Sequence, residues 1–471
     1  MKNTIWILCS VVWGLLLSDA ALAHPITFNS TMTYSAAQPS GAADSVAQWS
    51  GAAFDAANIG GSGVNADGGA NNGTANDAST RVTNQTTQGQ TFTTGSNANG
   101  YEVSGITVRL VGYTNNTATG ANQPSWNLGA VNWPTTVTVG KVNGTTHSLL
   151  SIQNFMPGGE GNPGVGSSAN GPGTYLTFNL PFPVHLNPNT TYCFDVATGS
   201  SFEWLGTSSD PYAGGTAYTR SGSTITPLSG DRVFQVNMTA SAAPYAPFTH
   251  PGALHTQSDF DRMKAKIAAG TAPWKTSYDQ FVGSRFASTG WGPTPYEYIN
   301  RGGTAQNNYT RTQWDGQAIY ELSLRWKLTG DVAYANQAVV IANAWSGKLL
   351  GITGDSNFAL ASGICGYLFA TGGEILSTYP GWPAAQKQAY KDMMMRVFYP
   401  LNQEFLWRHN GTPTNAGGNT HYRLNWDTDN MASMAAIGIL CDNRAVYQQA
   451  VDYFKFGSGN GRVERAAWYI H

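Results

Sequence analysis

The hydrophobic period of this 471-residue chain changes near residue 241, and that change limits the possible folds more than any other feature. In the run 101–110, Ile106, Val108 and Leu110 fall on one face. Alternation of this kind, with turn residues between runs, is typical of half-buried antiparallel strands. Similar runs occur at 136–140, 174–180, 192–196 and 232–238. The sequence therefore predicts an N-terminal all-β sandwich or jelly roll.

After residue 257 the apolar residues recur every three or four positions, which indicates helices. Ser258 is predicted to cap a first helix that carries Phe260, Met263 and Ile267. Further helices are predicted at 313–328, 332–345, 357–377, 384–406, 427–440 and 445–456. The short connections between them favour antiparallel hairpins, which can form part of an (α/α) toroid.

The N-terminal segment has the pattern of a secretory signal peptide. Lys2 precedes an apolar run at 5–17, and the tripeptide Ala-Leu-Ala at 21–23 matches a cleavage site. The run is too short to favour a membrane anchor. We expect a secreted or periplasmic protein with no integral membrane segment after signal cleavage. The predicted parts are a signal peptide (1–23), a β-sandwich accessory domain (24–240), a linker (241–256) and a partial helical (α/α) toroid domain (257–471).

The amino-acid composition limits the kinds of partner that the protein is expected to bind. Charged residues make up 11% of the chain, against about 25% in an average soluble protein. The net charge of −2 gives no basic surplus, so nucleic acid is not an expected partner. The 15 Trp residues are compatible with carbohydrate binding. After signal cleavage three cysteines remain, and Cys365 and Cys441 either form a disulfide or stay as buried thiols.

Three polar clusters at helix ends are the places where chemistry is expected. They are 298–302 with 307–311, 409–410 with 419–427, and 457–461 with 468–471. His421 stands out because the whole chain has only eight His, and Tyr422, Arg423, Asn425 and Trp426 follow it closely. A structural interpretation is also open, in which His421 and Asn425 cap the following helix.

This set of residue types fits β-elimination from a uronic acid. The sugar carboxylate must be neutralised so that a proton can leave the carbon next to it, and Asn, Arg or protonated His can donate to that carboxylate. His or Tyr can act as the base and as the acid that protonates the leaving oxygen. No metal or other cofactor is required. Hydrolysis would instead need two facing carboxylates, and Asp427 and Asp429 are better explained as acids at a helix start.

Several short motifs then occur in one order across about 220 residues: HPGALHT (250–256), QWDGQ (313–317), NWD (425–427), MAAIG (434–438) and GSGNG (457–461). Together they resemble the alginate lyase-like polysaccharide lyases. The resemblance implies an (α/α) toroid and β-elimination of a uronate polysaccharide. It places Asn425 at the Asn that neutralises the substrate carboxylate. It places His471 where a loop His follows the Gly-Asn-Gly turn.

Members of the family continue past the position that matches His471, with further helices. We therefore expect an incomplete toroid. Either the chain is a fragment of a longer product, which we favour, or the domain has decayed. The expected substrate is a uronic-acid polysaccharide such as alginate or glucuronan, and the alternative is a non-catalytic carbohydrate-binding or adhesion protein. The predicted catalytic residues are Asn425, His421, His471 and Tyr422. The predicted substrate-binding residues are Arg423, Trp426, Asn307, Asn308, Arg301 and Trp314.

Overall fold

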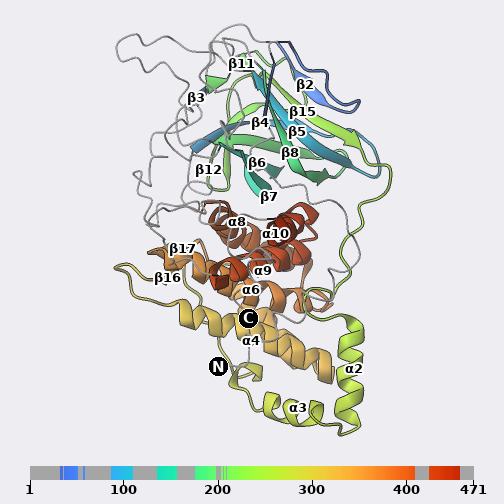
Figure 1. Cartoon of the computed structure of the whole chain (residues 1–471), viewed down its shortest axis with the longest axis vertical. Coiled ribbons are helices and arrows are strands. Elements are labelled where there is room, and N and C mark those ends of the chain that lie inside the picture. The colour runs from blue at the N-terminus through green and yellow to red at the C-terminus, as the bar shows by residue number, and fades with distance from the viewer. Residues whose placement is uncertain are drawn as a thin grey trace.

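The computed structural model describes residues 32–35, 37–50, 57–58, 86–109, 135–155, 175–197, 203–204, 206–207, 209–408 and 424–456. Strands occupy the first half of the chain and helices the second, as the change of period predicts (Figure 1). The predicted signal peptide lies outside the described residues. So do His421, Tyr422, Arg423 and His471.

The β half consists of two packed layers. One is an antiparallel five-stranded sheet with the order β1-β8-β5-β15-β2. The other closes on itself as a barrel with the order β12-β13-β7-β6-β9-β4. The strands of the open sheet are β1 (Met32–Ser35), β8 (Tyr175–Leu186), β5 (Tyr101–Arg109), β15 (Phe234–Ala240) and β2 (Val46–Gln48). Those of the barrel are β12 (Ala217–Ser221), β13 (Thr224–Pro227), β7 (Thr146–Phe155), β6 (Thr135–Asn143), β9 (Thr191–Ala197) and β4 (Thr86–Thr93).

Two short strand pairs complete the β half. The pairs are β3 (Ala57–Asn58) with β10 (Glu203–Trp204) and β11 (Gly206–Thr207) with β14 (Asp231–Arg232).

Side chains along β9 alternate between two buried environments. Phe194 and Val196 face the core between the layers. The alternate residue Asp195 is fully buried and pairs with Arg220 of β12 at 2.7 Å. Tyr218 donates a further hydrogen bond to Asp195 at 2.9 Å, so the buried charges are satisfied.

The predicted helices are confirmed, with small differences at their ends. The first begins at Gln257, and its cap is Thr256 rather than Ser258, because Thr256 and Asp259 form a capping box. The helices are α2 (Gln257–Ala268), α3 (Trp274–Val282), η4 (Arg285–Ala287), α4 (Tyr309–Thr329), α5 (Val332–Ser346), α6 (Asn357–Ser377), α7 (Ala384–Met393), η5 (Met394–Phe398), α8 (Tyr399–Arg408), α9 (Leu424–Leu440) and α10 (Arg444–Phe456).

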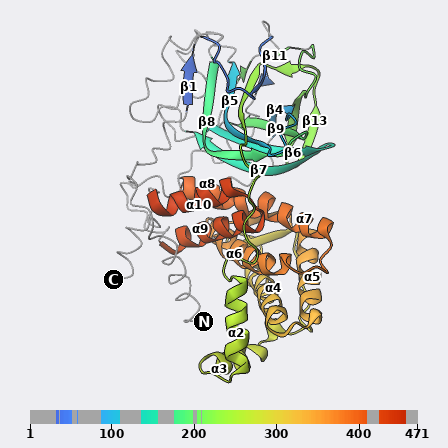
Figure 2. The ribbon, with the colours of Figure 1, turned by 90° about the vertical axis from the view of Figure 1, so that its right-hand side faces the viewer.

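The central helices α4, α6 and α9 lie side by side and run in the same direction. Gly316 of α4 packs against Phe369 of α6, and Gly372 of α6 packs one turn further along α4. Gly363 of α6 meets the backbone of α9, and Gly366 meets Ser433 one turn later. Because residue numbers rise together in both pairs, the three helix N-termini lie at the same end. The helices between them, α5 and α7–α8, carry the chain back (Figure 2).

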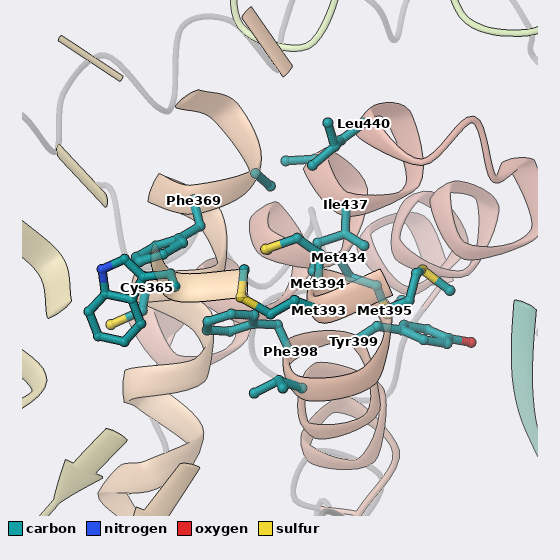
Figure 3. Close-up of a cluster of buried hydrophobic side chains, with 14 of the residues drawn as sticks. Cys365, Phe369, Met393, Met394, Met395, Phe398, Tyr399, Met434, Ile437 and Leu440 are labelled. Atoms are coloured by element: carbon teal, nitrogen blue, oxygen red, sulfur yellow. The ribbon is translucent and has the colours of Figure 1, made fainter. Parts of the chain in front are cut away.

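The helical core is rich in methionine and aromatic side chains, and α6 lies within it. Figure 3 shows Met393, Met394, Phe398 and Met434 packed together. The turn η5 is π-helical and lies two residues before Pro400, whose missing N–H cannot continue the α-helical ladder. Helix α6 is long and apolar enough to cross a membrane, but 83% of its most apolar window is buried in the fold, as expected of a core helix.

The two halves of the chain contact each other through β7. The Tyr399 hydroxyl accepts a hydrogen bond from the Ile152 N–H at 2.9 Å and donates to its carbonyl at 3.1 Å. Asn154 donates to Gln403 at 2.8 Å. Asn443 donates to the Leu150 carbonyl at 2.7 Å. The β half is thus joined to η5–α8 and to the start of α10.

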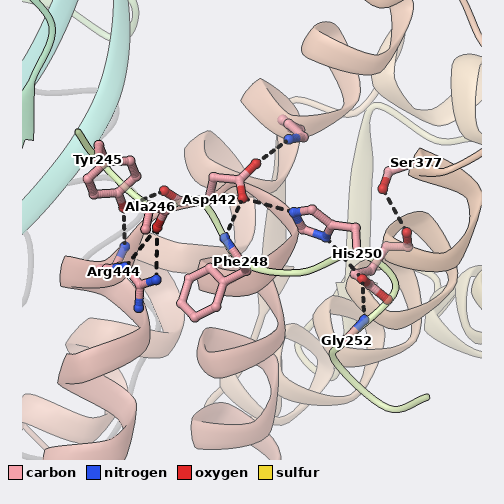
Figure 4. Close-up of polar contacts among 10 residues, drawn as sticks. Tyr245, Ala246, Phe248, His250, Gly252, Ser377, Asp442 and Arg444 are labelled. Atoms are coloured by element: carbon pink, nitrogen blue, oxygen red, sulfur yellow. Dashed lines mark hydrogen bonds and ion pairs between the residues drawn. The ribbon is translucent and has the colours of Figure 1, made fainter. Parts of the chain in front are cut away.

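The connecting segment is anchored by charged side chains of the helices (Figure 4). His250 lies between two carboxylates, with Nδ1 at 3.1 Å from Glu374 and Nε2 at 2.8 Å from Asp442. Tyr245 donates to the Asp442 carbonyl at 2.7 Å, and Arg444 donates to the Ala246 carbonyl at 2.8 Å. These contacts hold the segment against α6 and the α9–α10 turn.

Candidate functional site

A short parallel strand pair positions the first polar cluster beside the N-termini of the central helices. Strand β16 (Tyr298–Arg301) pairs with β17 (Gly351–Gly354), and Arg301 lies opposite Gly354. Gly354 has a φ of +141°, and a Cβ atom there would collide with the Arg301 backbone. Glycine is therefore required at this position. Because β17 leads directly into α6, the pair brings Arg301 to the rim where α4, α6 and α9 begin (Figure 1).

Two asparagines hold the loop between β16 and α4. Asn308 accepts a hydrogen bond from the Asn300 N–H at 2.8 Å and donates to the Tyr298 carbonyl at 3.0 Å. Asn307 accepts from the Gly302 N–H at 2.7 Å. The side chains of Asn307 and Asn308 were predicted to bind substrate, and these bonds hold the loop that follows Arg301.

Unlike most arginines of the helical half, Arg301 has no hydrogen-bond or ion-pair partner among the described residues. Its guanidinium lies 4.5 Å from the centre of the Tyr309 ring. It forms no hydrogen bond or ion pair with any described residue, and its Nη1 atom is buried without a partner. Arg311, by comparison, donates to the Gly292 carbonyl at 2.6 Å, and Arg396 donates to the Leu349 carbonyl at 3.0 Å. A buried guanidinium nitrogen without an acceptor is costly unless a ligand supplies one.

The end of the molecule around Arg301 favours negative charge. The N-termini of α4, α6 and α9 lie there together, and each carries the positive end of a helix dipole. An exposed carboxylate, Asp355, already accepts hydrogen bonds from the N–H and side chain of Asn357 at the start of α6. The rim as a whole suits an anionic ligand.

Helix α9 presents two polar side chains one turn apart on its accessible face. Asn425 is exposed, and its side-chain amide makes no hydrogen bond within the described part of the chain. Asp429 is partly buried and also accepts no hydrogen bond there. Burial raises the pKa of Asp429 to about 7, against the opposing effect of the nearby positive charge of Arg301. Like Arg301, Asp429 and Asn425 therefore have side chains that form no hydrogen bond with a described residue.

The two predicted tryptophans have packing roles instead. Trp426 is 5% exposed and stacks on Phe405 with ring centres 5.9 Å apart, so its ring is not open to a sugar. Trp314 packs edge-on against Trp291, and the Arg285 guanidinium covers its ring at 4.7 Å. Both residues were predicted to bind substrate, and in the structure both rings pack in aromatic clusters.

The carboxylates near the first cluster are also used structurally. Asp315 is fully buried and accepts hydrogen bonds from the indoles of Trp291 and Trp345, each at 2.9 Å. Glu321 accepts from Gln317 at 2.7 Å. Asp427 is fully buried and has contacts of its own. Asp427 and Asp429 were considered from the sequence as a hydrolytic pair. Of these two, only Asp429 has a carboxyl group that makes no hydrogen bond with a described residue.

The charge of Arg301 acts on Asp429, which lies one turn after Asn425 on α9, although 124 positions separate Arg301 from Asn425 in the sequence. The other predicted catalytic residues, His421, Tyr422 and His471, lie outside the described residues, as does Arg423. Asp429 was considered from the sequence and explained as an acid at a helix start; its spacing of four from Asn425 places it one turn further along α9. Cys365 and Cys441 are free thiols. Within the described ranges, no three His, Cys, Asp or Glu side chains are grouped to hold a metal ion.

Comparison with known protein families identifies the family of the helical half. Residues 255–466 match the alginate lyase family. The predicted resemblance is therefore confirmed for the C-terminal half, and we call residues 255–466 the lyase-family domain. This domain contains Arg301, Asn425 and Asp429. No curated protein matches the chain. The family supports a polysaccharide lyase acting on a polysaccharide substrate.

Proposed function

We propose that the protein is a secreted polysaccharide lyase that cleaves a uronic-acid polysaccharide, alginate or glucuronan, by β-elimination. The observation that carries the proposal is the unpaired guanidinium of Arg301 in a lyase-family domain, at the end where three helices begin. A sugar carboxylate is an anion of the size and charge that this guanidinium can bind with two hydrogen bonds. A neutral sugar would leave Arg301 unmatched.

The chemistry assigned to the described residues is neutralisation of that carboxylate. Arg301 pairs with it, and the exposed amide of Asn425 donates a hydrogen bond to it. Withdrawing charge from the carboxylate stabilises the enolate that forms when the neighbouring C5 proton is removed. A base takes this proton, the C4–O4 bond breaks, a C4–C5 double bond forms, and an acid protonates O4. We assign the base and the acid to His421, Tyr422 and His471 on the sequence evidence alone.

The architecture supports this assignment. Helices α4, α6 and α9 run in parallel, and α5 and α7–α8 return the chain between them, which is the arrangement of an arc of an (α/α) toroid. We propose this toroid as the frame of the catalytic domain and the β half as a jelly-roll accessory domain. In such an arc the rim formed by the inner helix N-termini is where the polymer would lie.

The proposal is tested by incubating the full chain with alginate, glucuronan and pectate and following the ultraviolet absorbance of the new C4–C5 double bond. We expect the wild type to produce this signal on at least one uronan. Replacing Arg301 with Ala should lower kcat/KM by about 10²–10³, the usual loss when one charge-stabilising donor is removed.

Arg285→Ala is the matched control, because Arg285 is an exposed arginine that also lies over an aromatic ring, that of Trp314. Its activity should stay within about twofold of the wild type, as for a surface substitution away from the site. A wild type that cleaves none of the three polymers would refute the lyase assignment. Equal losses in Arg301→Ala and Arg285→Ala would remove Arg301 from the site.

A further inference from the structure

Four fully buried polar side chains join α6, α8 and α9 inside the helical half. They are Ser362 of α6, Asn402 of α8, and Asn430 and Ser433 of α9, and each is 0% exposed. Asn402 donates to Oδ1 of Asn430 at 2.8 Å and to the Ser362 hydroxyl at 3.1 Å. Ser433 donates to Oδ1 of Asn402 at 2.7 Å. We call these four residues the buried amide cluster, and the proposed reaction does not use them.

The side-chain amide of Asn430 extends from this cluster to the starts of two helices. Its Nδ2 atom donates to the Trp426 carbonyl at 2.8 Å and to the Ala359 carbonyl at 3.3 Å. Trp426 is the third residue of α9, and Ala359 is the third residue of α6. The two hydrogens of one amide therefore tie together the first turns of α6 and α9.

Two glycines of α6 make room for these contacts. A Cβ atom at Gly363 would lie 3.0 Å from the backbone nitrogen of Asn430, and a Cβ atom at Gly366 would collide with the Ser433 hydroxyl. The absence of side chains at both positions lets the backbone of α9 lie against that of α6. At this separation a short side chain of α9 can bond to a backbone carbonyl of α6.

Hydrogen-bonded amides give this contact a direction that apolar side chains would not. Replacing bonded partners by apolar groups of the same shape is often neutral or even stabilising, so the cluster is not needed to fill the core. Apolar contacts are non-directional, whereas a hydrogen bond weakens steeply when its angle changes. Every amide hydrogen of Asn402 and Asn430 has an acceptor. The cluster therefore fixes how α9 is rotated and shifted against α6.

We infer that Asn430 is a positioning residue, which holds the first turn of α9 against the first turn of α6. Asn425 lies in that turn of α9, and β17, the partner strand of β16, leads into the first turn of α6. Asn430 thereby fixes the backbone of Asn425 relative to the strand pair that carries Arg301, and it does so without contacting substrate. The effect on catalysis rests on the proposed function, whereas the effect on the two helix turns can be measured without it.

The first test compares the kinetics of Asn430→Leu and of the triple variant Asn402→Leu, Asn430→Leu, Ser433→Ala with those of the wild type on the uronan that the wild type cleaves. We expect kcat to fall about 10²-fold in both, as when a catalytic group is displaced by about 1 Å. KM should change less than about threefold, because every proposed binding group is still present. The unfolding midpoint of the triple variant should stay within about 4 °C of the wild type, because no amide of the cluster is left unpaired.

Gln449→Met is the matched control. Gln449 of α10 is also a buried amide, and it contacts the Tyr399 hydroxyl at 3.1 Å but bonds to neither α6 nor α9 among the described residues. This variant should keep the wild-type kcat. A wild-type kcat in the triple variant would overturn the inference, because any loss in Asn430→Leu would then come from unpaired amides. An equal loss of kcat in Gln449→Met would overturn it as well.

The second test does not depend on activity. Backbone hydrogen exchange is followed by mass spectrometry in peptides from the first half (424–432) and the second half (433–440) of α9. In Asn430→Leu, exchange in the first half should become about five- to tenfold faster, the effect of losing one or two hydrogen bonds, and the second half should change less than about twofold. Equal acceleration in both halves, or none, would overturn the inference. Acceleration confined to the first half in a protein that cleaves no uronan would keep the positioning role and refute the lyase assignment alone.

Discussion

At the scale of single residues, the polar side chains of the helical half divide into those that are engaged and those that are not. Asn308 and Asp315 are each held by two or more hydrogen bonds, which makes them parts of the scaffold. Arg301, Asn425 and Asp429 make none within the described ranges, although two of the three are partly buried. Since buried polar groups are normally satisfied, Arg301 and Asp429 stand out from the scaffold residues.

Asn425 supplies the residue-scale prediction. Asn425→Ala should lower kcat/KM on the cleaved uronan by about 10²–10³, because one donor to the developing enolate is lost. The thermal unfolding midpoint should stay within about 1 °C, since the amide is exposed and makes no hydrogen bond among the described residues. Steady-state kinetics and circular dichroism check the two parts. An unchanged rate would exclude Asn425 from catalysis.

At the scale of elements, small residues and one irregular turn determine how the helices meet. Glycines on α6 let α4 and α9 approach its backbone, which places the three N-termini together. The π-helical turn η5 and Pro400 interrupt the long helix 384–408 where Tyr399 bonds to β7. The site therefore depends on helix–helix contacts, and the contact at Gly363 meets the backbone of Asp429 directly.

Gly363→Ala tests this dependence. The added Cβ would lie 2.9 Å from the carbonyl carbon of Asp429, so the α6–α9 contact must open. We expect the free energy of unfolding to fall by about 1–3 kcal/mol, as in other overpacked cores, and kcat/KM to fall with it. Gly292→Ala is the control, because nothing lies within 4 Å of its added Cβ. Urea denaturation measures the free energy of unfolding of the two variants. Equal values would show that the α6–α9 contact can relax.

At the scale of the whole molecule, the connecting segment and β7 join the two halves. His250 is the central group, since it bridges the buried Glu374 to Asp442. Hydrogen bonds to Asp442 and Glu374 raise the pKa of His250 to about 9, although burial acts in the opposite direction. His250 is therefore charged at neutral pH and balances the charge of a carboxylate that has no exposure to solvent.

The His250 contact should make stability depend on pH. Because its folded-state pKa lies above the ordinary value of 6.5, its contribution is fully present below about pH 6.5 and is lost as pH rises through about 9. His250→Gln should lower the free energy of unfolding by about 2–3 kcal/mol at pH 6, and by less at pH 10. Urea denaturation at the two pH values measures the difference.

His185→Gln serves as the control for this prediction. His185 also contacts a carboxylate, Glu102 at 2.8 Å, but that carboxylate is 42% exposed. A solvated pair contributes little, so the loss should stay below about 1 kcal/mol at both pH values. A His250→Gln penalty that did not shrink between pH 6 and pH 10 would contradict the charge-based explanation.

The sequence determined the kinds of element and their order, and it led to the family. Period-two and period-3.6 patterns depend on neighbours two to four positions away, so β5, β9 and all the long helices could be predicted. Strand β4 was missed because its buried residues include Gln90 and Thr91, which face polar partners and break the apolar alternation. Arg301 and Asn425 were both predicted, but as members of separate clusters.

Only the tertiary structure decided which of the predicted polar residues remain available. Trp426 became core, Asn308 became a loop anchor, and Asp429 became a partly buried carboxyl near the charge of Arg301. Burial, hydrogen-bond satisfaction and the field of a distant charge depend on what packs across from a residue, and no local pattern encodes that partner. The type of each side chain is written in the sequence, whereas its protonation state and its freedom to bind follow from the packing of α4, α6 and α9.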